Sequence, residues 1–181
     1  ICWSLVGSEM CIRDRDVSAI LSAKTPPPAL MMPKVRSPDE VKMLDQLLSE
    51  AGHDTRLHVI IETNEGLEAA YEIAHSSSRI DAMFFGAIDM APELRCDMAW
   101  EPLLYARSKV VHAAASAGLD VIDVPYMDLE DLDGMRVAAE QARMLGFSGK
   151  GSIHPKQIPI LNEVFTPVSY THLRAHETPA N

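Results

Sequence analysis

Two acidic residues, Glu62 and Asp89, follow two similar apolar runs in the sequence. The first run, LHVII at 57–61, ends directly at Glu62, and the second, AMFF at 82–85, is followed by Gly86 and then by Asp89. Short apolar runs bounded by turn residues predict strands that are buried on both faces of a parallel sheet. The carboxyl ends of such strands meet at one edge, with neighbours about 4.8 Å apart, so the two acids could share one hard divalent cation.

Helix capping is the alternative role for both acids. Asp89 could cap a helical turn, and Glu62 with Thr63 could cap the helix that follows Gly66. We favour a metal site because both acids take the same place in a strand-to-loop unit, and ligands of α/β folds collect at the carboxyl ends of strands. Lys34, at the end of an earlier predicted strand, could face the same site or be an ordinary surface lysine.

The elements that must position these residues alternate between strand and helix five times. Ser37 begins the first complete helix as N-cap, with Pro38 at the first helical position and Glu40 closing a capping box. Asp89 is expected in a loop. The predicted strands span 29–32, 57–61, 82–85, 121–124 and 149–153, and the predicted helices span 37–51, 66–75, 101–117, 132–145 and 157–165.

Repeated strand–helix units indicate an α/β fold with a parallel sheet, which can be closed or open. A complete (β/α)₈ barrel needs about 250 residues, which exceeds the length of this chain. The five units are therefore either a small doubly wound domain or part of a truncated barrel. A helix that is cut at Asp16 favours the truncated barrel.

The two ends of the chain look foreign to its body. LVGSEMCIRD at 5–14 and VSYTHLRAHET at 168–178 can be encoded by complementary DNA strands, and both resemble one transposase adapter read in opposite directions. We therefore exclude residues 1–15 and 168–181 from fold reasoning and assign a single domain to residues 16–167. A natural leader and tail is the alternative.

Composition narrows the class of protein. The formal net charge is −10 without a basic run, which argues against nucleic-acid binding. No apolar run reaches membrane-spanning length, and the first residues do not form a secretory signal. Cys96 is the only cysteine of the body, which is typical of a reducing compartment, so we expect a cytoplasmic protein.

Five motifs together resemble the citrate lyase β-subunit family, the HpcH/HpaI group of aldolases and CoA-ester lyases. They occur in the family's order and cover the body of the chain. The chain departs from the family's pattern at Met90, where leucine is usual, and at Arg95, where glycine is usual. The motifs are MMPKV (31–35), IIETNEG (60–66), FFGAIDMAPEL (84–94), AGLDVIDVPYMDLEDLDG (117–134) and LGFSGKGSIHPKQIPILNEVF (145–165).

The resemblance implies a (β/α)₈ TIM barrel of the phosphoenolpyruvate-binding type, in which the five units correspond to strands four to eight. It also implies that Glu62 and Asp89 are Mg²⁺ ligands. Backbone amides near Gly86 and Ala87 would hold a substrate carboxylate, since glycine lets a ligand approach the main chain closely. Apart from the resemblance, the strand-end position of Lys34 makes it a candidate partner for a carboxylate or for an anionic substrate.

The implied activity is a Mg²⁺-dependent carbon–carbon lyase. It would cleave or form a malyl-, citramalyl- or citryl-CoA type of 3-hydroxyacyl-CoA, with an acyl-CoA thioester and a small 2-oxo acid as partners. The alternatives are an aldolase acting on hydroxy-oxo acids without CoA, or a non-catalytic barrel subunit. The parent is expected to be a homo-oligomer, a trimer or hexamer. This chain should be inactive alone, because the family's substrate-binding arginine lies on a barrel strand that precedes the five units found here.

Two further residues carry open alternatives. Asp123, at the end of its predicted strand, could face the site or stabilise the following turn, and we favour the turn. His154, before Pro155, could be an acid or base, but a hydrogen-bonded structural histidine at a strand-to-helix junction is the preferred interpretation.

Overall fold

The structure is a computed structural model that describes residues 3–4 and 10–166, with side chains from residue 16 onward. Its strands are β1 (Trp3–Ser4), β2 (Ala29–Met32), β3 (Arg56–Ile61), β4 (Ile80–Phe85), β5 (Asp120–Asp123) and β6 (Gly149–Lys150). Its helices are α1 (Met10–Leu21), α2 (Pro38–Glu50), α3 (Asn64–Glu68), α4 (Ala70–Ala74), α5 (Ala87–Leu94), α6 (Leu104–Ala117), α7 (Leu132–Leu145), α8 (Ile158–Phe165) and the 3₁₀ helix η1 (Pro155–Gln157).

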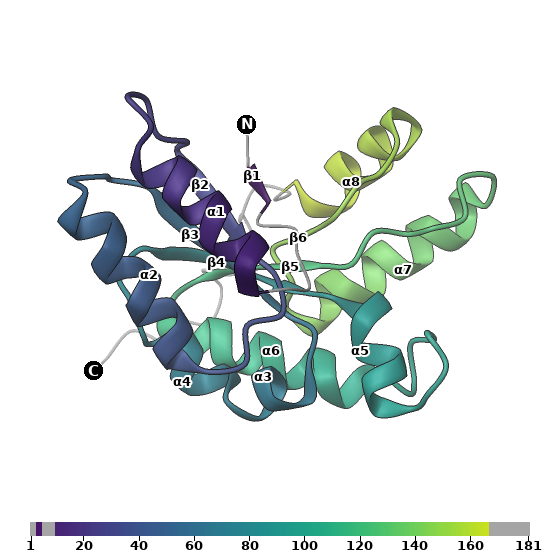
Figure 1. Ribbon diagram of the computed structural model, residues 1–181. Coiled ribbons are helices and arrows are strands. Elements are labelled where there is room, and N and C mark those ends of the chain that lie inside the picture. The colour runs from purple at the N-terminus through teal and green to yellow at the C-terminus, as the bar shows by residue number, and fades with distance from the viewer. Residues whose placement is uncertain (1–2, 5–9, 167–181) are drawn as a thin grey trace, which may run out of the picture.

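The strands form one sheet in chain order from β1 to β6, and every pair is parallel (Figure 1). In the middle of this sheet, Val59 of β3 lies opposite Met32 of β2 and Met83 of β4. The parallel register places the carboxyl ends of β3 and β4 side by side, which confirms the expectation that the residues after these strands meet at one edge.

The prediction of five strands is corrected by β1. Trp3 and Ser4 pair with Leu30 and Met31 of β2, so a sixth strand precedes the five predicted ones. β1 and the start of α1 lie inside the segment 1–15 that we excluded as adapter-derived, whereas residues 1–2, 5–9 and 167–181 lie outside the described residues. The adapter origin and the domain bounds stay predictions.

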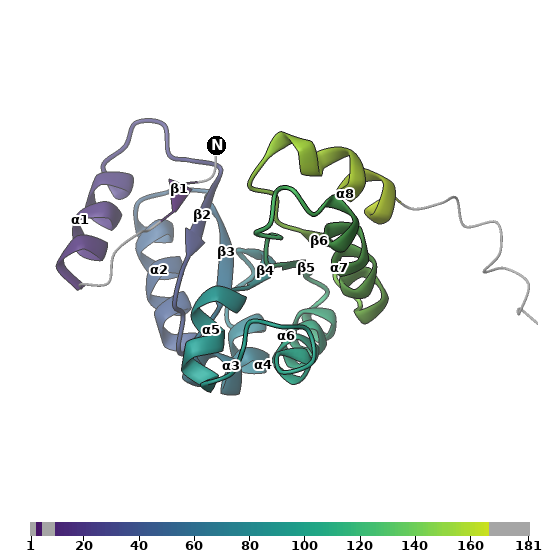
Figure 2. The same ribbon diagram turned by 90° about the vertical axis from the view of Figure 1, so that its right-hand side faces the viewer.

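The helices lie in an arc along one face of the sheet (Figure 2). The strand side chains that face this layer are buried, among them Leu57, Val59 and Met83. The side chains of the opposite face, such as Ile60 and Phe84, are only half-buried. The prediction that the strands are buried on both faces is therefore wrong, because one layer of helices covers one face only.

Local signals set most helix ends. α7 has the predicted bounds, and α6 and α7 end at Gly118 and Gly146, both in the left-handed conformation that glycine adopts without strain. The capping box at α2 is wrong in detail: Ser37 makes no side-chain cap, and Glu40 Oε2 instead accepts a hydrogen bond of 3.1 Å from the Arg36 N–H. No helix within residues 3–4 and 10–166 has both the length and the apolar character needed to cross a membrane.

Candidate metal and substrate site

Glu62 comes directly after β3, at the carboxyl end of the sheet. Its side chain is turned inward, and the residue is only 7% exposed. Thr63 caps α3 by accepting a hydrogen bond of 3.1 Å from the Gly66 N–H, so helix capping is carried by Thr63 and not by Glu62. The carboxylate of Glu62 is therefore left for another role.

Asp89 lies in the first turn of α5 and not in the loop that the sequence predicts. The helix begins immediately after Gly86, because the apolar residues Ala87, Met90 and Ala91 are buried against the core on one side of it. Asp89 is not the cap of this helix, since Gly86 takes the N-cap position. Its negative charge is still favourable there, near the positive end of the helix dipole.

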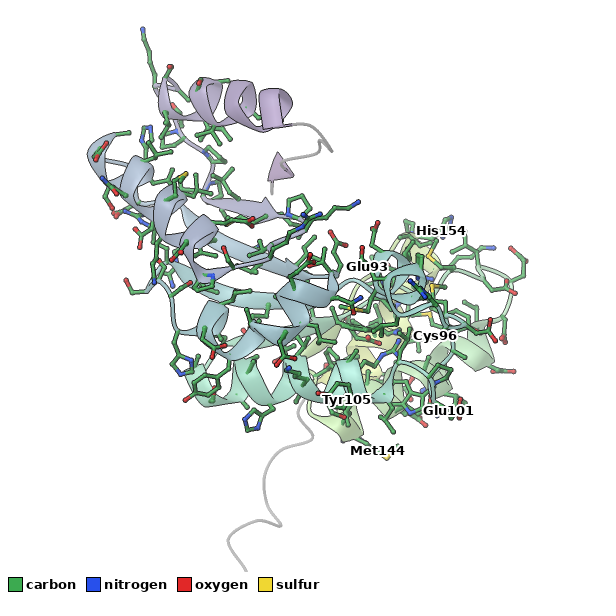
Figure 3. The ribbon with its side chains drawn as sticks, turned by 60° about the horizontal axis from the view of Figure 1, so that its bottom comes forward. Glu93, Cys96, Glu101, Tyr105, Met144 and His154 are labelled. Atoms are coloured by element: carbon green, nitrogen blue, oxygen red, sulfur yellow. The ribbon has the colours of Figure 1, made fainter. Side chains whose placement is uncertain are left out.

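The ends of α3 and α5 are tied together, which fixes the two acids relative to each other. The Asn64 side-chain amide donates a hydrogen bond of 3.0 Å to the carbonyl oxygen of Glu93, and the Asn64 N–H donates one of 3.3 Å to Glu93 Oε2. Figure 3 labels Glu93 near the end of α5, two residues before the left-handed Arg95 (φ 56°) that closes the helix. Arg95 occupies the position where the family usually has glycine.

Lys34 contacts both acids from the end of β2. Its backbone N–H donates a hydrogen bond of 2.9 Å to Glu62 Oε1, and its Nζ lies 3.2 Å from Asp89 Oδ1. The residue has a φ of 53°, a left-handed conformation that costs an ordinary residue about 1–2 kcal/mol. The structure thus brings Lys34 together with Glu62 and Asp89, whereas the sequence left open whether Lys34 faces the site or is an ordinary surface lysine.

The environment of Glu62 favours its protonated form. Burial raises the pKa of the Glu62 carboxyl above its ordinary value. The hydrogen bond from the Lys34 N–H and the Lys34 charge lower this pKa, whereas the negative charge of Asp89 and a hydrogen bond between the two carboxyl groups raise it further. The negative charge of Asp89 therefore acts on the Glu62 carboxyl group at close range.

Because Gly86 has no side chain, the Glu62 carboxylate can pack directly against its backbone. A Cβ atom at Gly86 would lie 2.5 Å from Glu62 Oε2 and 2.6 Å from Glu62 Cβ. The Gly86 N–H donates a hydrogen bond of 3.1 Å to the carbonyl oxygen of Ile61, and a substrate-binding role for the amides near Gly86 and Ala87 stays a prediction. Ala87 begins α5, where backbone N–H groups have no acceptor within the helix.

The donor set fits a magnesium ion. Mg²⁺ in proteins is bound by one or two carboxylates and keeps several waters or substrate oxygens. Glu62 and Asp89 supply two carboxylates, and within the described part of the chain no third histidine, cysteine or acid joins a cluster that could hold a metal. The remaining positions would fall to water and substrate, as an open catalytic magnesium site requires.

Asp123 takes a role that the sequence did not suggest. Its buried carboxylate accepts hydrogen bonds from Arg107 Nε at 3.0 Å and from Lys150 Nζ at 2.6 Å. The Arg107 guanidinium also lies over the rings of Phe85 and Trp100, with centroid distances of 5.0 and 4.8 Å. Asp123 therefore faces neither the site nor the following turn but joins α6 to β5 and β6.

His154 has the structural role that we preferred. It is the N-cap of η1, and its Nδ1 accepts a hydrogen bond of 3.1 Å from the Lys156 N–H (Figure 3). This contact uses one ring nitrogen to begin the helical segment after β6.

A parallel α/β sheet with two carboxylates at neighbouring strand ends defines this chain as an α/β protein with a candidate magnesium site. Residues 7–155 match the family described as HpcH/HpaI aldolase/citrate lyase, and the chain belongs to this family. The family resemblance inferred from the five motifs is thereby confirmed.

Curated relatives are named as CoA-ester lyases. The mitochondrial citramalyl-CoA lyase of Rattus norvegicus is 30% identical over 190 residues, which cover 91% of this chain and 56% of that protein. The L-malyl-CoA/beta-methylmalyl-CoA lyase of Cereibacter sphaeroides is 32% identical over 173 residues, which cover 82% of this chain and 54% of that protein. The chain thus spans about half the length of these relatives.

Solved structures share the fold. RipC from Yersinia pestis superposes with a TM-score of 0.88 at 36% identity, covering 93% of this chain and 77% of that one. The citrate lyase beta subunit from M. tuberculosis, complexed with oxaloacetate and magnesium, has a TM-score of 0.75 at 24% identity and covers 92% of this chain and 73% of that one. The second likeness shows the fold alone.

Proposed function

We propose that this chain carries the metal-binding half of a carbon–carbon lyase that acts on 3-hydroxyacyl-CoA thioesters of the malyl-, citramalyl- or citryl-CoA type. The observation that carries the proposal is the pair Glu62 and Asp89, brought together at the carboxyl ends of β3 and β4 and contacted by Lys34. The names of the relatives support the thioester substrate and the lyase reaction.

Glu62 and Asp89 would hold Mg²⁺. When bound, the ion would stabilise the negative charge on the oxygen of the 2-oxo acid that is released or consumed. The Lys34 N–H keeps Glu62 Oε1 in one orientation, so the carboxylate needs little rearrangement to act as a ligand. The Ala87 amide, at the start of α5, would donate to the carboxylate of the acid.

We also propose that the five units from β2 to β6 correspond to strands four to eight of a (β/α)₈ barrel. Two observations support this correspondence. The face of the sheet away from the helices is only half-buried at Ile60 and Phe84, as expected for a barrel interior that further strands would fill. The relatives are also about twice as long as the matched part.

An aldolase that acts on hydroxy-oxo acids without CoA is the second candidate, because the family includes such enzymes by description. The same two carboxylates would serve that reaction. The two candidates differ in whether a thioester is needed, so substrate choice separates them.

The test is an assay of the full-length parent protein with malyl-, citramalyl- and citryl-CoA, beside free hydroxy-oxo acids that carry no CoA. We expect cleavage of at least one thioester that is lost with EDTA, restored by Mg²⁺, and absent from the Glu62→Gln variant. Turnover of free acids alone would favour the aldolase. Thioester cleavage that persists in both Glu62→Gln and Asp89→Asn would contradict the proposed role of the pair.

A further inference from the structure

Lys34 occupies an unusual position for a lysine. It contacts both acids through different atoms, its N–H reaching Glu62 and its Nζ reaching Asp89. It does so from a left-handed backbone conformation (φ 53°) that glycine would adopt without strain. A strained residue at a functional site indicates that its side chain has a role there.

The two contacts of Lys34 differ in which residue types could make them. Any residue except proline could supply the N–H that binds Glu62, and glycine would supply it at lower cost. Only the contact with Asp89 requires a positively charged side chain at this position. The positive charge, 3.2 Å from Asp89 Oδ1, is therefore the feature of Lys34 that explains why glycine does not occupy this strained position.

We propose that the Lys34 ammonium is the resident cation of the metal-free site, and that a divalent ion must compete with it for Asp89. This inference rests on the proposed metal site at Glu62 and Asp89. In the metal-free chain, the ammonium offsets the repulsion between the two carboxylates. When a metal ion binds, the ammonium is displaced from Asp89 or is held beside a second positive charge, and either change weakens metal binding.

The side chains of Lys34 and Asp89 are 42% and 47% exposed, so water moderates the effect. A unit charge a few ångströms from a divalent ion in such a place changes a binding constant by about five- to tenfold. We therefore expect the Lys34→Met variant to bind Mn²⁺, a paramagnetic substitute for Mg²⁺, about five- to tenfold more tightly than the unmodified chain. The exposure of Lys34 also lets the freed ammonium move toward an anionic substrate.

The experiment is a titration of the 181-residue chain with Mn²⁺, monitored by electron paramagnetic resonance. It compares the unmodified chain with three variants at position 34 and one at position 42. Lys34→Met removes the charge, Lys34→Gly removes the charge and the backbone strain but keeps the N–H, and Lys34→Arg keeps the charge. Lys42→Met removes an equal charge from an exposed position on α2, where Nζ lies 3.5 Å from Asp39 Oδ1. We expect tighter Mn²⁺ binding in the Met and Gly variants at position 34 and unchanged binding in the other two.

Glu62→Gln and Asp89→Asn separate failure of this inference from failure of the proposed function. If these two variants lose Mn²⁺ binding while Lys34→Met and Lys34→Gly bind no more tightly than the unmodified chain, the metal site stands and the competing role of Lys34 is overturned. If the unmodified chain binds Mn²⁺ no better than Glu62→Gln and Asp89→Asn, both are overturned. Because Lys34→Gly relieves strain, it also covers the case in which Lys34→Met fails to fold.

Discussion

Replacing Gly86 with alanine tests the packing that shapes the candidate site. The new Cβ would lie 2.5 Å from Glu62 Oε2, 2.6 Å from Glu62 Cβ and 3.1 Å from Ile60 Cγ2. Since it meets the root of the Glu62 side chain as well as its end, rotation of the carboxylate alone cannot relieve the overlap. Overpacking of this kind costs about 1–3 kcal/mol.

Two further terms affect the net result for Gly86→Ala. The backbone at Gly86 has φ −96°, which alanine adopts freely, so lower entropy of the unfolded chain returns about 0.4–1 kcal/mol. Displacement of Glu62 also weakens its 2.9 Å hydrogen bond from the Lys34 N–H, which costs about 1.5–3 kcal/mol if the bond is lost. With the hydrogen bond lost, these terms give an expected loss in free energy of unfolding of about 1.5–6 kcal/mol.

Gly149→Ala is the matched control. Its Cβ would meet only the end of the Ile122 side chain, Cδ1 at 3.0 Å, which can move aside. Urea denaturation measures both variants, and Mn²⁺ titration measures the site. We expect Gly86→Ala to lose stability and to bind Mn²⁺ at least tenfold more weakly, and Gly149→Ala to change little in either. Equal stability and equal Mn²⁺ affinity in the two variants would refute the close packing of Gly86 on Glu62.

Two other variants probe the buried charges. Asp123→Asn leaves Arg107 and Lys150 as buried cations without their anion, so the free energy of unfolding should fall by about 3–5 kcal/mol in urea denaturation; a loss below 1 kcal/mol would count against the buried cluster. Glu62→Gln should change the pH dependence of stability. The pKa of Glu62 is raised in the folded chain above its ordinary value of 4.5, so the folded chain binds the Glu62 proton more tightly than the unfolded chain does. The free energy of unfolding therefore falls as pH rises from 4.5 through the raised pKa. In metal-free buffer, Glu62→Gln should therefore be more stabilising at pH 7 than at pH 4, and an equal effect at both would contradict the raised pKa.

Much of the site could be predicted from the sequence, because its position follows from the strand pattern. The apolar runs before Glu62 and Gly86 end where the strands end, and parallel register then places the residues that follow at one edge. The same reasoning made Lys34 a candidate from the end of β2 but did not separate a place at the site from an ordinary surface lysine. Its contact with both acids was not predictable, since it depends on one left-handed backbone angle.

Other features depend on contacts that no local pattern records. Asp123 takes its partners from residues 16 and 27 positions away, on a helix and on another strand, so the sequence near Asp123 indicated only the site or the following turn. The segment of α5 is expected as a loop from the sequence, yet burial of Ala87 and Met90 against the core holds it helical. The half-buried sheet face was missed because a short apolar run does not reveal how many faces are covered.

The most direct test of the metal site is a crystal structure of the chain grown with Mn²⁺, in which anomalous scattering locates the ion. We predict one peak between Glu62 and Asp89, about 2.1–2.3 Å from an oxygen of each, with water in the remaining positions. A peak bound to only one of the two acids, or a site without a peak at saturating Mn²⁺, would contradict the conclusion that the pair forms a metal centre.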